Sequence, residues 1–139
     1  MPKILIICTG NSCRSIMGEA LINARLGDQG IRAFSAGSHP SGHVNPHAVQ
    51  ALMAIDAWEE HYHSKTIEAA RAHEPFDLVI TVCDRAKESC PVFPSQTKTI
   101  HVGFEDPDGK PYAAFVETRN LIENRLLSVV RQALGDLSA

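Results

Sequence analysis

Two segments of the chain are apolar at consecutive positions, and two more are rich in residues that favour strands. After Lys3 and Asp77, residues 3–7 and 77–82 carry only apolar or β-branched side chains, at odd and even positions alike, which predicts strands buried on both faces. Residues 31–35 and 98–102 predict two further strands. The pattern therefore indicates a parallel sheet that is covered on both sides.

Helices are predicted between these strands. The first follows a polar stretch after the first strand and ends near Gly27. Its apolar face is formed by Met17, Ala20, Leu21 and Ala24. A second helix is expected after Asn45-Pro46, because Asn is a good N-cap and Pro is favoured at the first helical position. Residues 67–72 predict a short third helix.

The last part of the chain has the strongest helical period. Over 113–134 its apolar positions are spaced by seven, four, three and four residues: Phe115, Ile122, Leu126, Val129 and Ala133. Strands and helices alternate throughout, which favours right-handed crossovers between parallel strands. We therefore expect one α/β domain over residues 1–139, a three-layer sandwich in which helices flank a four-stranded parallel sheet.

The composition narrows the function classes. Of 139 residues, 44% are hydrophobic and 21% charged, which is ordinary for a globular protein, and the net charge is −3. Without a block of Lys or Arg, neither a nucleic-acid partner nor an anionic membrane surface is expected. The longest apolar run, residues 4–8, is too short to span a bilayer, and no export signal is recognised. We expect a cytoplasmic protein and, at this size, a monomer.

The four cysteines are the first candidates for chemistry: Cys8, Cys13, Cys83 and Cys90. Their spacings lack the tight pairs of a zinc site, so we expect no metal there. In a chain without an export signal, reduced thiols are expected rather than structural disulfides. Cys8 and Cys83 each follow a buried strand, and ligands bind outside the carboxyl ends of parallel strands. The two cysteines are therefore expected at the same edge of the sheet.

The stretch Cys8-x5-Arg14-Ser15 joins a strand to a helix and predicts an anion cradle. A loop this short can curl so that backbone N–H groups point inward, and Gly10 and Asn11 tolerate the positive φ that such curling needs. The helix N-terminus adds partial positive charge, and Arg14 can grip two oxygens with its planar fork. The same field favours the thiolate of Cys8, which would share one pocket with the bound anion.

Three other loop residues are assigned smaller roles. A hydroxyl from Ser15 or Ser12 can donate a hydrogen bond to the Cys8 sulfur. Cys13 is expected to pack inside the protein rather than to react.

Together these residues resemble a known active site. The stretch Cys8, Thr9, Gly10, Asn11, Ser12, Cys13, Arg14 and Ser15 is similar to the oxyanion-binding loop of the low-molecular-weight protein tyrosine phosphatase fold. Within that group the chain resembles the thioredoxin-coupled arsenate reductases. Further stretches that match this branch are 35–37, 45–48, 77–83 with Cys90-Pro91, and 103–107 with Gly109-Lys110.

The resemblance implies a relay of three thiols. Cys8 would attack arsenate, Cys83 would attack Cys8 and release arsenite, and Cys90 would attack Cys83. Two electrons are needed to turn As(V) into As(III), and one thiolate cannot supply both without entering a disulfide. Thioredoxin, or a glutaredoxin or low-molecular-weight thiol in its place, would reduce the final Cys83–Cys90 disulfide. No cofactor is implied.

The spacing of the last two thiols adds a prediction about motion. In an intact helix over 83–90 the two α-carbons would lie roughly 10 Å apart. A disulfide needs α-carbons within about 7 Å of each other. This segment must therefore rearrange when Cys83 and Cys90 join.

Asp106 is the implied acid. In the family the matching carboxylate serves proton transfer at the nucleophile and the leaving oxygen. Two other functions remain open. One is a phosphatase that hydrolyses phosphate monoesters through Cys8 and Asp106. The other is a non-catalytic thiol switch that binds oxyanions.

The resemblance also raises a cation site. Some reductases of this family bind potassium, and Asn11, Glu19 and Ser35 resemble three of the contributors. Lys65 falls where the family has an acid. An ammonium would repel a cation and could take its place, so we expect no potassium site.

Overall fold

The computed structural model describes residues 2–83, 93 and 97–138. Four strands form one sheet: β1 (Lys3–Cys8), β2 (Arg32–Gly37), β3 (Leu78–Thr81) and β4 (Lys98–His101). Their order is β2-β1-β3-β4, and every neighbouring pair is parallel. The predicted α/β class and the four-stranded parallel sheet are therefore confirmed.

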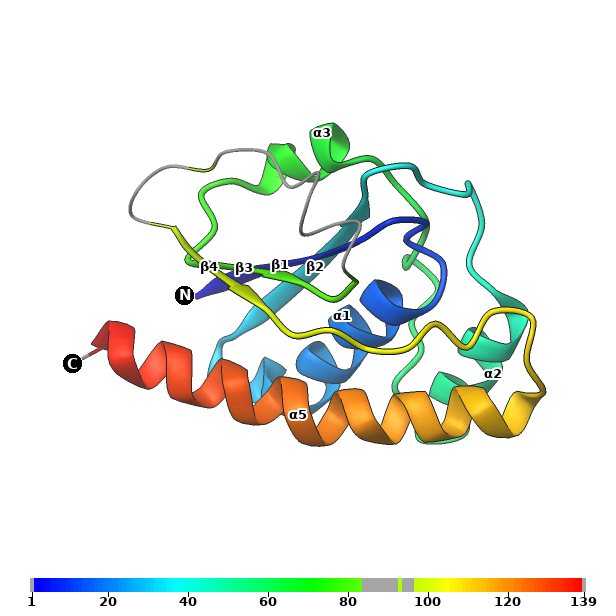
Figure 1. The fold of residues 1–139 in the computed structure, drawn as a ribbon. Helices are drawn as coiled ribbons and strands as arrows, with labels where there is room; N and C mark the ends of the chain where they lie inside the picture. The colour runs from blue at the N-terminus through cyan, green and yellow to red at the C-terminus, as the bar shows by residue number, and fades with distance from the viewer. Residues whose placement is uncertain (1, 84–92, 94–96, 139) are drawn as a thin grey trace.

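Helices cover both faces of this sheet (Figure 1). They are α1 (Arg14–Leu26), α2 (Pro46–Met53), α3 (Ile67–Ala70) and α5 (Tyr112–Ser138), with short 3₁₀ turns η1 (Gly27–Gln29) and η2 (Arg71–His73). Helices α1 and α5 pack together on one face, whereas α3 lies on the other beside β2. No helix in the described part of the chain is long and apolar enough to cross a membrane.

The start of α2 follows the sequence signal closely. Pro46 occupies the first helical turn, and the Asn45 side chain accepts a hydrogen bond of 2.9 Å from the His47 backbone N–H. This cap satisfies one of the amides that a helix start leaves without a partner. Residues 58–65, whose pattern favours neither helix nor strand, form no regular element.

Two apolar positions differ from the expected helix faces. Ala24 is exposed on α1, where the buried residues include Ile16 and Ile22 instead. On α5, Val130 is fully buried and Val129 only partly so. Helix α1 lies between the sheet and α5, so it is buried over a wider arc than a surface helix would be.

The topology creates a crevice at the carboxyl end of the sheet. From β1 the chain passes to β2 on one side, and it later returns to β3 on the other side of β1. Ligands bind at such a switch point, because the connections leave the adjoining strand ends in opposite directions. Cys8 ends β1, and Cys83 follows the end of β3, so both thiols lie at this crevice.

Candidate active site

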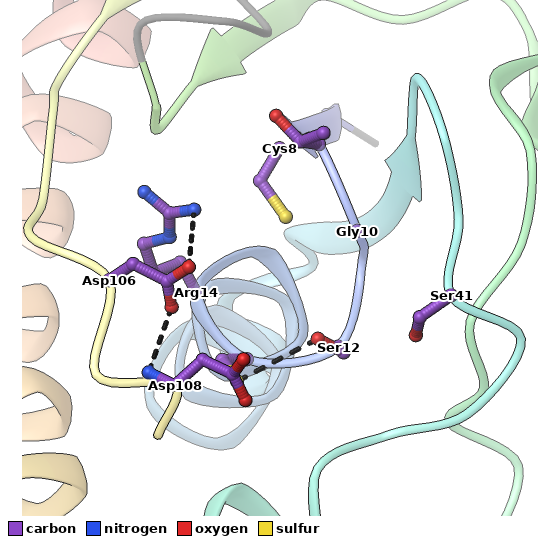
Figure 2. Close-up of a pocket in the computed structure, with 9 residues that line it drawn as sticks. Cys8, Gly10, Ser12, Arg14, Ser41, Asp106 and Asp108 are labelled. Carbon is purple, nitrogen blue, oxygen red and sulfur yellow. Dashed lines mark hydrogen bonds and ion pairs between the residues drawn. The ribbon is translucent and has the colours of Figure 1, made fainter. Parts of the chain in front are cut away.

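The nucleophile candidate lies at the bottom of a curled loop. Cys8 is buried, and residues 9–13 turn from the end of β1 into the start of α1. Figure 2 shows this loop passing around the Cys8 sulfur, which lies near the N-terminal end of the helix. The sulfur is therefore placed where backbone amides and the helix dipole favour negative charge.

A second segment holds the loop in this shape. Ser38, His39, Ser41 and Asn45 donate backbone N–H bonds of 2.9–3.1 Å to loop carbonyls of Cys8, Thr9, Gly10 and Ser12. The carbonyl side of the loop is therefore turned outward and satisfied. On the other side of the loop the Asn11 N–H donates to the Cys8 sulfur, which agrees with the arrangement of backbone amides that binds anions.

The backbone geometry of the loop agrees with the sequence at one residue and not at the other. Asn11 has φ of 49°, in the left-handed region, and is fully buried. Gly10 does not have a positive φ, so this expectation was wrong. Here the curl is achieved at Asn11, whose side chain is anchored by neighbours on three sides.

Two hydrogen bonds reach the Cys8 sulfur. The Asn11 backbone N–H donates to it over 3.2 Å, and the Ser15 hydroxyl lies 2.9 Å away. The other candidate hydroxyl, that of Ser12, lies 3.7 Å from the sulfur of Cys13. Of the two serines weighed from the sequence, Ser15 is the one that contacts the Cys8 sulfur.

Arg14 closes one side of the pocket. Its Nη1 donates to the Phe104 carbonyl over 3.1 Å, and its Nη2 lies 3.4 Å from Asp106 Oδ2 (Figure 2). The first turn of α1 contains no acidic residue, and no side chain caps it. The helix start is thus open to an anion, with a guanidinium beside it.

The pocket has a volume of about 300 Å³ and brings together Cys8, Arg14 and Asp106 with four further loop residues. Of the other predicted site residues that the structure describes, Asn11, Ser15 and Cys83 do not line it. Its lining is Cys8, Thr9, Gly10, Ser12, Cys13, Arg14, Ser41, Asp106 and Asp108. Ser41 and Asp108 line the pocket although the sequence pattern gives neither of them a role there. Ser41 comes from the segment that holds the loop carbonyls, and no signal in its own sequence marks it. Asp108 is held by Asn45 Nδ2, which donates to its carboxylate over 3.0 Å.

Cys13 has an environment unlike that of Cys8. Burial raises the pKa of the Cys13 thiol to about 12, and the nearby Asp106 and Asp108 charges add to the rise. At neutral pH this group is therefore a protonated thiol, which is a poor nucleophile.

Cys83 lies beside the loop. It is buried, and its sulfur is 3.2 Å from the hydroxyl of Thr9, the residue after Cys8. Cys8, Cys13 and Cys83 are all free thiols. Cys90 and residues 84–89 lie outside the described residues, so the expected rearrangement of 83–90 stays a prediction.

Comparison with known proteins decides the family. The model of the low molecular weight phosphotyrosine protein phosphatase family matches residues 3–136. The chain belongs to this family. Among its relatives, arsenate reductase 2 of Staphylococcus epidermidis is 38% identical over 125 residues, which are 90% of this chain and 93% of the relative.

Solved structures of the phosphatase family include both kinds of enzyme. A structure described as an arsenate reductase in the phosphate binding state is 28% identical with a TM-score of 0.76, covering 96% of this chain and 99% of that one. The low molecular weight protein tyrosine phosphatase from Bacillus subtilis is 27% identical with a TM-score of 0.77, covering 96% and 98%. The shared fold therefore does not separate reductase from phosphatase.

An ammonium lies among the residues whose resemblance raised a cation site. Lys65 Nζ donates to the backbone carbonyls of Ser35 (3.0 Å) and His63 (2.8 Å) and lies 3.9 Å from Glu19 Oε1. A cation placed among these oxygens would meet the lysine charge at close range, so the residues present do not fit potassium. Within the described residues no three His, Cys, Asp or Glu side chains are grouped to hold a metal ion.

Proposed function

We propose that this phosphatase-family protein reduces arsenate to arsenite through a relay of Cys8, Cys83 and Cys90. The observation that carries the proposal is the second free thiol beside the loop: Cys83 Sγ lies 3.2 Å from the hydroxyl of Thr9. Hydrolysis of a phosphate ester has no use for such a thiol, whereas reduction requires one. The arsenate reductases among its relatives support the same reaction.

In the first step the Cys8 thiolate attacks arsenic. Arsenate carries its charge on tetrahedrally arranged oxygens, which the loop amides and the Arg14 fork accept. The S–As bond forms as one arsenate oxygen leaves. Asp106, which lines the pocket beside Arg14, supplies the proton with which that oxygen leaves as water.

The second step transfers the electron pair. The Cys83 thiolate attacks Cys8 Sγ, so an S–S bond forms and the S–As bond breaks. The bonding pair stays on arsenic, which leaves as As(III) arsenite while two thiols become one disulfide. Cys90 then attacks Cys83 Sγ, which restores the Cys8 thiolate and moves the disulfide to Cys83–Cys90.

An external dithiol protein completes the cycle. Two electrons leave for each arsenite, so a reductant such as thioredoxin must return two to the Cys83–Cys90 disulfide. A glutaredoxin or low-molecular-weight thiol would serve the same chemistry. The relay runs without an organic cofactor. It also requires reduced thiols at the start, which fits the cytoplasm, and we propose a monomer.

A phosphatase is the second candidate function. The loop, Arg14 and Asp106 together meet the needs of ester hydrolysis, because phosphate has the shape and charge of arsenate. Only the thiol outside the loop distinguishes the two reactions. The test must therefore change Cys83 and leave the loop intact.

Oxidation of NADPH, coupled through thioredoxin and its reductase, is the deciding measurement. The wild-type protein should consume NADPH when arsenate is added, and Cys83→Ser should abolish this. Hydrolysis of p-nitrophenyl phosphate, if present, should survive in Cys83→Ser because Cys8, Arg14 and Asp106 are untouched. Cys13→Ser is the matched control, and it should keep most of the arsenate-dependent rate, since its thiol stays protonated.

Mapping of disulfide bonds by mass spectrometry tests the order in which the three thiols react. Cys90→Ser should complete about one turnover and then accumulate a Cys8–Cys83 bond. Ester hydrolysis without arsenate-dependent NADPH oxidation would replace the proposal by the phosphatase. Turnover of neither substrate with excess reductant would favour the oxyanion-binding thiol switch.

A further inference from the structure

An ion pair between a buried glutamate and a half-buried lysine lies behind the active-site loop and takes no direct part in the chemistry. The side chains of Glu19 and Lys65 are only 5% and 14% exposed, and Lys65 Nζ lies 3.9 Å from Glu19 Oε1. Burial raises the pKa of Glu19 and lowers that of Lys65, and in each case the partner's charge opposes the effect. Each group is therefore held in its charged form partly by the other.

The pair is linked to the nucleophile by a continuous chain of hydrogen bonds. The Ser35 hydroxyl donates to Glu19 Oε1 over 2.5 Å, and Asn11 Nδ2 donates to Ser35 Oγ over 3.0 Å. Asn11 Nδ2 also donates to Ser15 Oγ over 2.7 Å, and Ser15 Oγ lies 2.9 Å from Cys8 Sγ. These residues come from β1, α1, β2 and the loop.

The direction of each proton in this chain is fixed from the Glu19 end. A carboxylate only accepts hydrogen bonds, so the Ser35 hydroxyl must donate its hydrogen to Glu19. The Ser35 oxygen then accepts a hydrogen bond from the Asn11 amide. The Asn11 amide cannot flip, because its Oδ1 accepts the Lys65 backbone N–H over 2.9 Å. Ser15 Oγ therefore accepts a hydrogen bond from the Asn11 amide, which leaves its own hydroxyl hydrogen to be donated to the Cys8 sulfur.

Lys65 acts on this chain at two points. Its backbone N–H orients Asn11, and its ammonium balances Glu19 while also binding the Ser35 and His63 carbonyls. Among the described residues, no buried side-chain nitrogen or oxygen lacks a hydrogen-bond partner. The Glu19 and Lys65 charges thus balance each other, and their polar atoms have hydrogen-bond partners within the protein.

We infer that the Lys65 ammonium is a built-in cation that positions the anion-binding loop, acting through Glu19, Ser35 and Asn11 to direct the Ser15 proton at Cys8. Lys65 is thus a positioning residue and touches neither substrate nor the reacting sulfur. The inference rests on the proposed function only in taking Cys8 as the nucleophile. It requires that the protein bind oxyanions equally well whichever monovalent cation the buffer contains.

Two measurements test the inference without any turnover. One is the affinity for inorganic phosphate by calorimetry, and the other is the rate at which iodoacetamide alkylates Cys8, followed on its peptide by mass spectrometry. Lys65→Met should weaken phosphate binding and slow alkylation, each by about tenfold. Without the ammonium, the hydrogen-bond directions from Glu19 through Ser35 and Asn11 are no longer fixed. Lys3→Met is the matched control and should change neither. Its ammonium also bonds a carbonyl, that of His73, but at the opposite end of β1.

Small cations should rescue a variant with room for them. In Lys65→Ala, methylammonium or potassium should restore much of the phosphate affinity relative to tetramethylammonium at equal ionic strength. The wild-type protein should respond to neither. Dependence of the wild-type protein on potassium would overturn the inference, as would unchanged phosphate affinity and alkylation in Lys65→Met.

A double variant keeps the test decisive if the single variants fold poorly. Glu19→Gln with Lys65→Met removes both charges, and the Gln oxygen can still accept from Ser35. It should bind phosphate more tightly than Lys65→Met alone. A double variant no better than the single one would show that the charge balance has no part in holding the loop. Because phosphate binding and alkylation need no reductant, failure of arsenate reduction would leave this result intact.

Discussion

At the scale of single residues, the guanidinium of Arg14 is held in a fixed orientation by two contacts. One guanidinium nitrogen bonds the Phe104 carbonyl and another faces Asp106, so the planar fork is held before any ligand arrives. Arg14→Lys would replace this fork by a point charge on a flexible stem. Phosphate affinity, measured by calorimetry, should fall by about tenfold to a hundredfold.

Arg25→Lys is the matched control for this change. Arg25 lies on the same helix and pairs with Glu123 at the surface, 2.6 Å away, far from the pocket. It should leave phosphate affinity unchanged. Equal affinity in Arg14→Lys and Arg25→Lys would show that the loop amides bind the anion without the fork.

The sequence was sufficient for some site residues and not for others. Cys8 and Arg14 could be predicted because their spacing between a strand and a helix fixes the loop by itself. Ser41 could not, since it reaches the pocket through a backbone bond to Gly10, across a turn with no pattern of its own. Contacts between distant loops depend on tertiary packing, which local sequence does not encode.

At the scale of elements, the end of β2 supports the loop by close approach. A Cβ added at Gly37 would lie 2.6 Å from the Thr9 carbonyl oxygen and 3.0 Å from the Asn11 Cβ. Backbone cannot give way as a flexible side chain does, so Gly37→Ala should displace the loop. We expect a loss of about 1–3 kcal/mol in the free energy of unfolding, measured in urea, and weaker phosphate binding.

Gly27→Ala separates this effect from a general cost of losing glycine. An added Cβ at Gly27 meets nothing within 4 Å, and the residue has helical backbone angles. Its stability should stay equal or rise by up to about 1 kcal/mol, with phosphate binding unchanged. Similar losses in both variants would rule out the steric reason given for Gly37.

Elements could be predicted wherever one period dominated the sequence. The four strands and the helix over 113–134 were found within a few residues of their observed bounds. The exact inward face was less certain, because Val129 and Val130 are both apolar and only the packing of α5 on α1 favours Val130. Residues 58–65 carry no period, yet they contribute Lys65 to the core of the loop support.

At the scale of the whole molecule, the fold brings together groups that are far apart in sequence. The crossing from β1 to β2 and the return to β3 place Cys8 and Cys83 at one crevice. The same packing places Glu19 of α1 beside Lys65, which is the last residue of the irregular segment 58–65. Cys8 and Cys83 thus lie at the carboxyl end of the sheet, and the Glu19–Lys65 ion pair lies behind the loop that follows Cys8.

The Glu19–Lys65 ion pair should make the free energy of unfolding depend on pH when the Lys65 ammonium is removed. Burial raises the pKa of Glu19 in the folded protein, so ionisation of Glu19 opposes folding. Stability is therefore lost as the pH rises above the ordinary pKa of a glutamate. Lys65→Met removes the ammonium that offsets this, so the pKa of Glu19 should rise further. The variant should be less stable than wild type by about 3 kcal/mol near pH 8, and the difference should shrink as the pH is lowered, because a larger fraction of Glu19 then carries a proton. Urea unfolding followed on Trp58, the single tryptophan, measures both.

The variant that combines Glu19→Gln with Lys65→Met provides the internal control, because it has no carboxylate to titrate. Its difference from Lys65→Met should grow from about pH 5 to about pH 8, the double variant being the more stable at the higher pH. Replacing a buried pair by neutral side chains often costs little, whereas an uncompensated buried charge costs much. A cost of Lys65→Met that stays constant between the two pH values would mean that Glu19 does not depend on Lys65 for its charge, and the loop would then need another explanation for its support.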